Sequence, residues 1–108
     1  MDQEDAVFSA LADRTRRQML DRLFEAPGLT LNDLVANLGM ARQSASRHLK
    51  VLEAAGLVVV RWQGREKKHF LNPVPIVEIE RRWTAKFDQI RSEALLAMKE
   101  RLESGEGQ

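Results

Sequence analysis

The stretch Ala41-Arg-Gln-Ser-Ala-Ser-Arg-His-Leu-Lys-Val-Leu-Glu-Ala-Ala-Gly56 has the pattern of an amphipathic helix. At about 100° per residue, small and apolar side chains fall on one side of it; they are Ala41, Ala45, Leu49 and Leu52. The far side carries an amide, a hydroxyl and two cations, contributed by Gln43, Ser46, Arg47 and Lys50. Such a face is either simply hydrated or contacts the phosphates and base edges of nucleic acid.

The residues before this stretch predict a second, shorter helix. Thr30 offers an N-cap, and apolar residues at helical spacing follow it until Gly39. Asp33 stands where a capping box normally has Glu or Gln, so we expect the box to be imperfect. Only Gly39, Met40 and Ala41 separate the two helices, which together predict a helix-turn-helix over about residues 30–55. Further upstream, residues 5–12 and 14–25 predict two more helices, and Asp13 is placed to cap the second one.

After Gly56 the apolar period changes to that of strands. Residues 57–63 and 66–71 are two short runs rich in Val, Trp and Phe, with Gly64-Arg65 between them. They predict a β-hairpin, or wing, over about residues 57–71, although Gly-Arg is a weaker turn signal than Asn-Gly.

From Pro75 to about Glu103 the chain has no Gly and no further Pro. Apolar residues recur every three or four positions, which predicts a helix of about 29 residues and about 43 Å. A domain of this size does not cover so long a stripe, so a second copy of the chain is the economical partner. Its predicted interface residues here are Ile79, Trp83, Phe87 and Ile90. Trp83 and Phe87 could instead line a small-molecule pocket between subunits, but an aromatic stripe is more often core.

Charge is unevenly distributed along the 108 residues, whose formal net charge is only +1. Between Ala41 and Phe70 lie seven basic and two acidic residues, whereas the rest of the chain has ten basic and fourteen acidic ones. A basic block in an otherwise acidic chain is typical of a surface that binds a polyanion.

The basic block therefore predicts a site for double-stranded DNA. Gln43 suits a bidentate contact with adenine, and Arg47 suits guanine or a phosphate. Arg42, Ser44, Ser46 and Lys50 complete the set on the helix. The wing cations are better suited to phosphates, where they give affinity rather than sequence choice; they are Arg61, Arg65, Lys67 and Lys68.

These residues resemble the ArsR-type (arsenic-repressor-like) winged helix-turn-helix regulators of bacteria and archaea. The resemblance lies in Ala10-Leu-Ala-Asp-Arg-Thr-Arg-Arg-Gln-Met-Leu20, in Leu34-Val-Ala-Asn-Leu-Gly-Met40 and in Ser44-Ala-Ser-Arg-His-Leu-Lys-Val-Leu-Glu-Ala-Ala-Gly-Leu-Val58. It implies a homodimer paired through the first and last helices, with Val7 and Leu11 added to the interface. It also implies binding to an imperfect palindrome at a promoter, usually as a repressor, with a recognition helix over Arg42–Ala55 and a wing over Val58–Leu71.

The chain departs from the family pattern at three places. Arg14 stands where Pro is common, and Ala41, a poor N-cap, stands where many members have Ser or Thr. That leaves open which of Arg42, Gln43 and Ser44 reaches a base. Metal-sensing members carry a cysteine pair in the third helix, or Asp, His and Glu ligands in the last. This chain has no cysteine, and its last helix has no histidine, so we predict no metal and no other cofactor.

Other polar residues give weaker signals. We expect His48 and His69 to pack or to donate to phosphate, and the acidic residues of the last helix to be hydrated rather than to bind metal. His48 follows Ser44 by four residues on the side expected to face DNA, but no acid is placed to orient the imidazole. No Gly-rich phosphate loop or nucleophile elbow is present, so we predict no catalytic residues and no enzyme.

The sequence thus predicts a mainly α single domain over residues 1–108, with about five helices and a two-stranded wing. Its last helix, about residues 75–103, serves dimerisation. The predicted function is that of a metal-independent, homodimeric transcriptional repressor in the cytoplasm of a bacterium or archaeon. The acidic N-terminus is unlike a signal peptide, and no apolar run reaches the roughly 18 residues of a membrane span. The alternatives are a winged-helix protein-interaction module and a metal-sensing repressor; no effector class is indicated.

Overall fold

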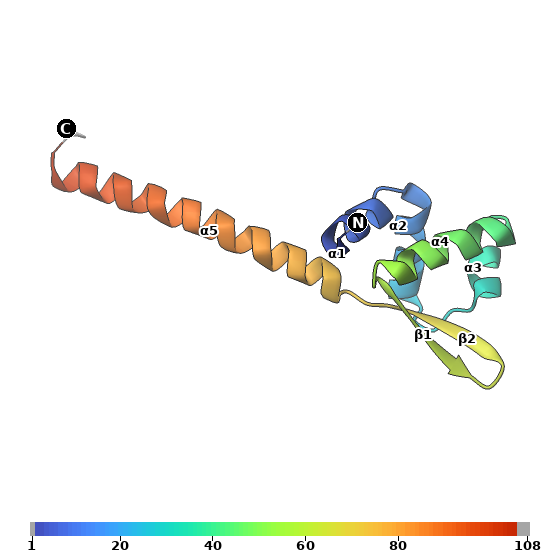
Figure 1. Ribbon diagram of the computed structural model, residues 1–108. Coiled ribbons are helices and arrows are strands. Elements are labelled where there is room, and N and C mark those ends of the chain that lie inside the picture. The colour runs from blue at the N-terminus through green and yellow to red at the C-terminus, as the bar shows by residue number, and fades with distance from the viewer. Residues whose placement is uncertain (1, 106–108) are drawn as a thin grey trace. The chain divides into compact units, whose positions relative to one another are not determined.

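The computed structural model describes residues 2–105, which form five helices and one antiparallel pair of strands (Figure 1). In chain order the elements are α1 (Gln3–Leu11), α2 (Arg14–Glu25), α3 (Leu31–Leu38), α4 (Arg42–Ala54), β1 (Val58–Gln63), β2 (Glu66–Leu71) and α5 (Val74–Glu103). The chain divides after Ile76 into two compact units, of which the first holds the winged helix-turn-helix. The second is the remainder of α5. The predicted order of elements is confirmed.

Side-chain caps determine where the early helices begin. Asp13 Oδ1 accepts from the Arg16 backbone N–H at 3.0 Å, as predicted, and this bond lowers the pKa of Asp13 below its ordinary value. At α3 the capping box is complete. Thr30 Oγ1 accepts from the Asp33 N–H at 3.2 Å, and Asp33 Oδ2 accepts from the Thr30 N–H at 2.9 Å. The expectation of an imperfect box was therefore wrong, because the shorter Asp side chain also reaches the capping backbone.

The turn into α4 is tight and lacks a polar cap. Gly39 ends α3 in the left-handed conformation with φ of 61°, which glycine adopts without strain. Ala41 is the N-cap of α4, has extended backbone angles, and makes no side-chain cap hydrogen bond. The predicted weak start of the recognition helix is thus confirmed, and its first residue is Arg42.

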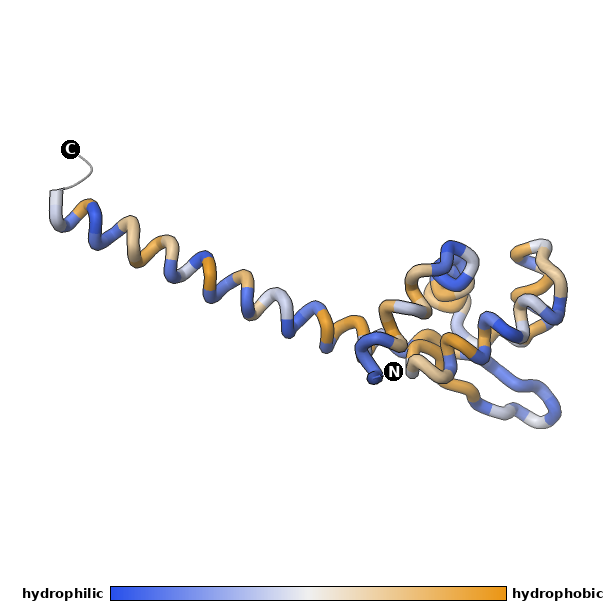
Figure 2. Tube along the Cα trace, turned by 45° about the horizontal axis from the view of Figure 1, so that its top comes forward, coloured by the Kyte–Doolittle hydropathy of each residue, from blue (hydrophilic) through white to orange (hydrophobic). Residues whose placement is uncertain are grey.

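The hairpin pairs Val58 with Leu71 at its base and Gln63 with Glu66 beside the turn. Gly64, with φ of 62°, is the first residue of the two-residue turn, where a Gly suits the twist of a hairpin. Figure 2 shows an apolar base and an increasingly hydrophilic tip. His69 fixes the base, because its backbone N–H and its Nδ1–H both donate to the Leu29 carbonyl at 2.9 Å.

One core joins the four short helices to the base of the wing. Its fully buried large side chains come from α1, α2, α3, α4 and the residues that lead into β1. They include Val7, Met19, Leu23, Leu34, Leu52 and Leu57. Buried Ala45 and Leu49 belong to the predicted apolar side of α4. This side of α4 is therefore fixed against the body, and its opposite side faces outward.

The last helix begins at Val74, one residue before the predicted start. The Asn72 Oδ1 atom accepts from the Val74 N–H at 3.2 Å, and Pro75 occupies the second helical position, where no N–H is needed. None of its residues is buried, and apolar and polar positions alternate along it (Figure 2). Among residues 2–105, no helix combines the length and the apolar character that crossing a membrane requires.

The uncapped start of α4 yields a stability prediction. Replacing Ala41 with Ser gives the free N–H groups an acceptor and should raise the free energy of unfolding by about 1 kcal/mol. Replacing Thr30 with Ala removes an existing cap and should lower it by about the same amount. Urea denaturation followed by circular dichroism measures both. If Ala41→Ser were neutral while Thr30→Ala was destabilising, the start of α4 would already be satisfied in another way.

Candidate nucleic-acid interface

The outward face of α4 presents the predicted base-reading residues. Gln43, Arg47 and Lys50 are exposed, and Ser46 is half-buried beside them. Ala45 and Leu49, on the opposite side, are at most 3% exposed, so the helix does not rotate without emptying the core. The face therefore carries an amide, a hydroxyl and two cations on one rigid element.

Two predicted residues lie at the margins of this face. Arg42 turns towards α3, where its Nη1 donates to Asn32 Oδ1. Ser44 precedes buried Ala45 and is itself half-buried. Of the three residues at the first turn of α4, Gln43 is thus exposed without a bond that ties it to α3, which favours Gln43 as the one that reaches a base.

The wing cations divide between the two faces of the hairpin, because successive side chains of a strand point to opposite sides. Lys67 lies on the side of α4, with its Nζ 3.8 Å from Glu53 Oε1. Arg61 and Lys68 are cross-strand partners on the other side. Lys68 is also closer to an acid, with its Nζ 3.1 Å from Glu66 Oε2, and its side chain is only 25% exposed. Lys67 and Arg65 are therefore the wing cations nearest to the α4 face.

A cleft of about 540 Å³ separates the wing from α4 and the first turn of α3. Cations and acids both line it, together with an indole and a buried imidazole. Its lining includes Ser46, Lys50, Glu53, Trp62, Arg65 and Lys67. The recognition face and the wing thus form the two sides of one concave, mostly polar surface.

Trp62 is a residue of this surface that the sequence analysis did not include. Its side chain is 66% exposed, and it pairs across the hairpin with Lys67. The sequence did contain a signal for Trp62, because Val58, Val60 and Trp62 alternate along β1 and so lie on the same face of the hairpin. It places all three on the α4 side, and only the first two lie close enough to the base to be covered.

The histidines have structural roles in the described chain. His48 was expected on the side facing DNA, and this was wrong: it is half-buried and its Nδ1 lies 3.2 Å from Arg16 Nη1. It lies three residues after Ala45 and four before Leu52, so it belongs to the inward side of α4. Since a guanidinium only donates, this contact requires the His48 Nδ1 to be an acceptor. His69 is 2% exposed and holds the wing base to Leu29.

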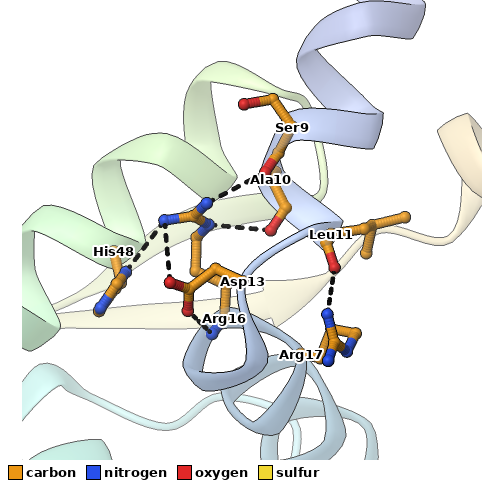
Figure 3. A network of polar contacts seen from close by, with 7 residues as sticks. All are labelled: Ser9, Ala10, Leu11, Asp13, Arg16, Arg17 and His48. Carbon is orange, nitrogen blue, oxygen red and sulfur yellow. Dashed lines mark hydrogen bonds and ion pairs between the residues drawn. The ribbon is translucent and has the colours of Figure 1, made fainter.

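Arg16 connects α1 to the recognition helix (Figure 3). Its Nε donates to the Ala10 carbonyl at 2.8 Å and its Nη2 to the Ser9 carbonyl at 3.0 Å, while its Nη1 meets His48. At the C-terminal end of α4, the Gln3 side chain donates to the Ala55 carbonyl at 2.6 Å. Polar contacts at the middle and at the C-terminal end of α4 therefore link it to α1, the first of them through Arg16 of α2.

The residues predicted for a dimer interface differ in exposure. Val7 is 1% exposed, so its side chain packs in the core, and its assignment to an interface surface was wrong. The neighbouring Phe8, which was not predicted, is 50% exposed. Leu11 and Ile79 are half-buried. The predicted residues further along α5 are 52–65% exposed; they are Trp83, Phe87 and Ile90.

No group of three or more His, Cys, Asp or Glu side chains that could hold a metal ion occurs within residues 2–105. The acidic side chains of α5 are exposed on the described helix. Acids also line the cleft, but Glu53 is paired with Lys67, and Glu66 is paired with Lys68 of the same strand.

Comparison with known proteins assigns this geometry to a class. A family model described as a helix-turn-helix domain matches residues 11–61. The uncharacterized HTH-type transcriptional regulator YuzN of Bacillus subtilis is 38% identical over 86 residues, which cover 74% of this chain and 94% of YuzN. The chain is thus a DNA-binding transcriptional regulator of the helix-turn-helix class and not an enzyme.

Solved structures narrow the class to a family. The crystal structure of an ArsR family transcriptional regulator is 32% identical, with a TM-score of 0.69, and the match covers 83% of this chain and 91% of that one. A homodimeric winged helix-turn-helix DNA-binding domain from Mycobacterium bovis is 25% identical, with a TM-score of 0.64 and coverage of 85% and 84%. The cadmium metal sensor CmtR of Mycobacterium tuberculosis is 36% identical, with a TM-score of 0.55 and coverage of 62% and 68%. The protein belongs to the ArsR family of winged helix-turn-helix regulators.

The Arg16 contacts yield a stability prediction, for which the adjacent Arg17 provides a matched control. Replacing Arg16 with Ala removes charged hydrogen bonds to two carbonyls and to His48, and should lower the free energy of unfolding by about 2 kcal/mol. Arg17→Ala removes one exposed bond, to the Leu11 carbonyl at 2.7 Å, and should cost at most about 0.5 kcal/mol. Urea denaturation of both variants makes the comparison. Equal losses in the free energy of unfolding would show that the Arg16 contacts between α1 and α4 do not stabilise the fold more than an exposed hydrogen bond does.

Proposed function

We propose that this regulator is a homodimeric repressor that binds an imperfect palindrome at promoters and is not controlled by metal. The observation that carries the proposal is the outward polar face of α4, with exposed Gln43, Arg47 and Lys50. A helix of this kind fits the major groove of B-DNA, where such side chains discriminate between base pairs.

The geometry supports distinct tasks for the two sides of the cleft. Gln43, Ser46 and Arg47 contribute base choice from α4, and Lys50 contributes to base or phosphate contacts. Arg65 and Lys67 bind phosphates from the wing, which adds affinity and salt dependence. Arg42, Ser44, Arg61 and Lys68 are secondary contacts in this proposal, because they lie at the margins of α4 or on the far face of the wing.

The exposed stripe of α5 supports a second copy of the chain as partner. Trp83 is 52% exposed and Phe87 is 63% exposed, and such large apolar side chains at helical spacing are normally covered. The Mycobacterium bovis relative is a homodimer of the same fold. A two-fold dimer places two recognition helices about 34 Å apart, one turn of DNA, which matches a palindrome.

Repression without metal is the mode of regulation we propose. Blocking a promoter needs only tight, specific binding, and the resemblance to ArsR-type regulators favours this mode. A cadmium sensor is among the relatives, but this chain has no cysteine, and thiolates are the ligands that soft metals such as cadmium prefer. The site of action is the cytoplasm of a bacterium or archaeon, where the DNA lies.

The DNA experiment uses a duplex recovered from a random pool by repeated selection, and its scrambled version. The wild-type protein should prefer the selected duplex, and Arg47→Ala should reduce this preference about tenfold or more. Arg47→Lys keeps the charge but loses the planar fork, so it should retain the salt dependence while losing much of the preference. Fluorescence anisotropy across a salt series measures each affinity.

Arg22→Ala is the matched control, because Arg22 is an exposed cation of α2 that is paired with Glu25 at 3.1 Å; it should leave the preference unchanged. Zinc or cadmium should leave all affinities unchanged. Equal affinity of the wild type for both duplexes would contradict sequence-specific binding. Absence of binding at low salt would instead favour a protein-interaction module, and stoichiometric release by metal would favour a metal sensor.

The dimer is tested on α5. Phe87→Glu places a charge in the proposed interface and should weaken dimerisation by at least about 100-fold, since an unpaired buried charge is strongly unfavourable. Ala85→Glu adds the same charge on the opposite side of the helix and should leave the dimer intact. Analytical ultracentrifugation at micromolar concentration distinguishes the outcomes. A wild-type protein that sediments only as a monomer would refute the proposed role of α5.

A further inference from the structure

Trp62 lies in the hydrophilic half of the wing, and its indole is not packed into the core. It is 66% exposed, and it lies on the cleft side of the hairpin with Lys67 as its cross-strand partner. Val58 and Val60, on the same side but nearer the base, are buried and half-buried. The body therefore covers the base of this face and leaves Trp62 open at its outer end.

Trp62 also differs from the second indole of the chain. The Trp83 ring has two cations over it, Lys86 Nζ at 4.8 Å and Arg82 Cζ at 5.5 Å from the ring centroid. Within residues 2–105, Trp62 has no ring contact and no hydrogen bond. Its indole N–H is thus a free donor beside a large uncovered apolar surface, a combination typical of residues that are covered when a partner binds.

The surroundings of Trp62 indicate what kind of partner covers it. The cleft that it lines is bordered by Lys50 on α4 and by Arg65 and Lys67 on the wing. Acids also line the cleft, and Glu53 lies 3.8 Å from Lys67 Nζ, but Lys50 and Arg65 have no ion pair within residues 2–105. A sugar–phosphate chain that contacted Lys50 and the wing cations would lie beside the indole. A protein partner would need acids matched to the cations and an apolar group against Trp62. The other apolar residues of the lining, Leu31 and Leu49, are half-buried and buried, so Trp62 is the large apolar side chain that the cleft exposes.

We propose that Trp62 is a DNA-contact residue, whose ring packs on a deoxyribose of the strand that runs between α4 and the wing. Its N–H donates to a phosphate oxygen of that strand. This inference rests on the proposed DNA binding by α4 and deepens it. The contact fixes the distance between the backbone and the recognition helix, so it adds affinity at the edge of the site that α4 reads.

An apolar contact and a cation contact differ in their response to salt. Neutralising a phosphate releases condensed counterions, and each such contact adds to the slope of log affinity against log salt concentration. Packing of a neutral ring releases few ions. Trp62 and Lys67, which face each other across the hairpin, therefore provide a matched pair that separates the two kinds of contact.

The experiment measures affinity for the selected duplex across a salt series for Trp62→Ala, Trp62→Phe and Lys67→Ala. Trp62→Ala should weaken binding about tenfold at every salt concentration, the size expected when one aromatic contact with nucleic acid is removed. Its salt slope should equal that of the wild type. Trp62→Phe should lose less, because it retains a ring. Lys67→Ala should flatten the slope by about one.

A spectroscopic measurement reports on the indole directly. The chain has two tryptophans, so the emission of the wild type minus that of Trp62→Phe isolates Trp62. This difference should shift or be quenched in proportion to the duplex bound. Wild-type affinity of Trp62→Ala would overturn the inference while leaving DNA binding by α4 intact, and so would an unchanged emission at saturation. A flattened slope in Trp62→Ala would also overturn it. Failure of the wild type to bind any duplex would instead refute the proposed function, and would leave a protein as the partner of Trp62.

Discussion

Burial of one side of α4 is the constraint on which the rest of the first unit depends. Ala45, Leu49 and Leu52 are at most 3% exposed, and the helices before α4 and the strand after it supply the surface that covers them. The helical repeat fixes which residues lie opposite one another, so burial of the apolar side of α4 determines which of its residues face outward. The polar face of α4 is thus a consequence of core packing. The Arg16 and Gln3 contacts then link the helix to α1 at its middle and at its C-terminal end.

Most of the fold could be predicted from the sequence because its signals are local. Apolar periodicity, Gly39 and the hairpin glycine predicted every element of the first unit. The predicted bounds of α4 and of both strands lie within one or two residues of the observed ones. The completed capping box at Asp33 was missed because the usual signature asks for a longer side chain. Local patterns are sufficient to predict helices and strands. Whether the Asp33 carboxylate reaches the Thr30 N–H depends on atomic positions, which only the structure gives.

The site was predicted less completely, because its composition depends on which elements pack together. The spacing of His48 from Ala45 and Leu52 already indicated the inward side of α4, but its partner, Arg16 from another helix, could be identified only in the structure. Val7, which the family resemblance assigned to the interface, lies in the core, while its neighbour Phe8 is exposed. Lys67 and Lys68 are equivalent in a count of charges, and the hairpin separates them onto opposite faces.

This separation changes how the basic block between Ala41 and Phe70 is to be understood. Its net charge attracts a polyanion from a distance, where the arrangement of individual cations matters little. In the proposed complex, a rigid duplex would meet only the side of the wing that faces α4, so cations on the other side would contribute through their field alone. In that complex the wing would act as one wall of a cleft rather than as a cluster of charges, and the proposed contact of a neutral side chain on that wall, Trp62, would contribute as much as a lysine.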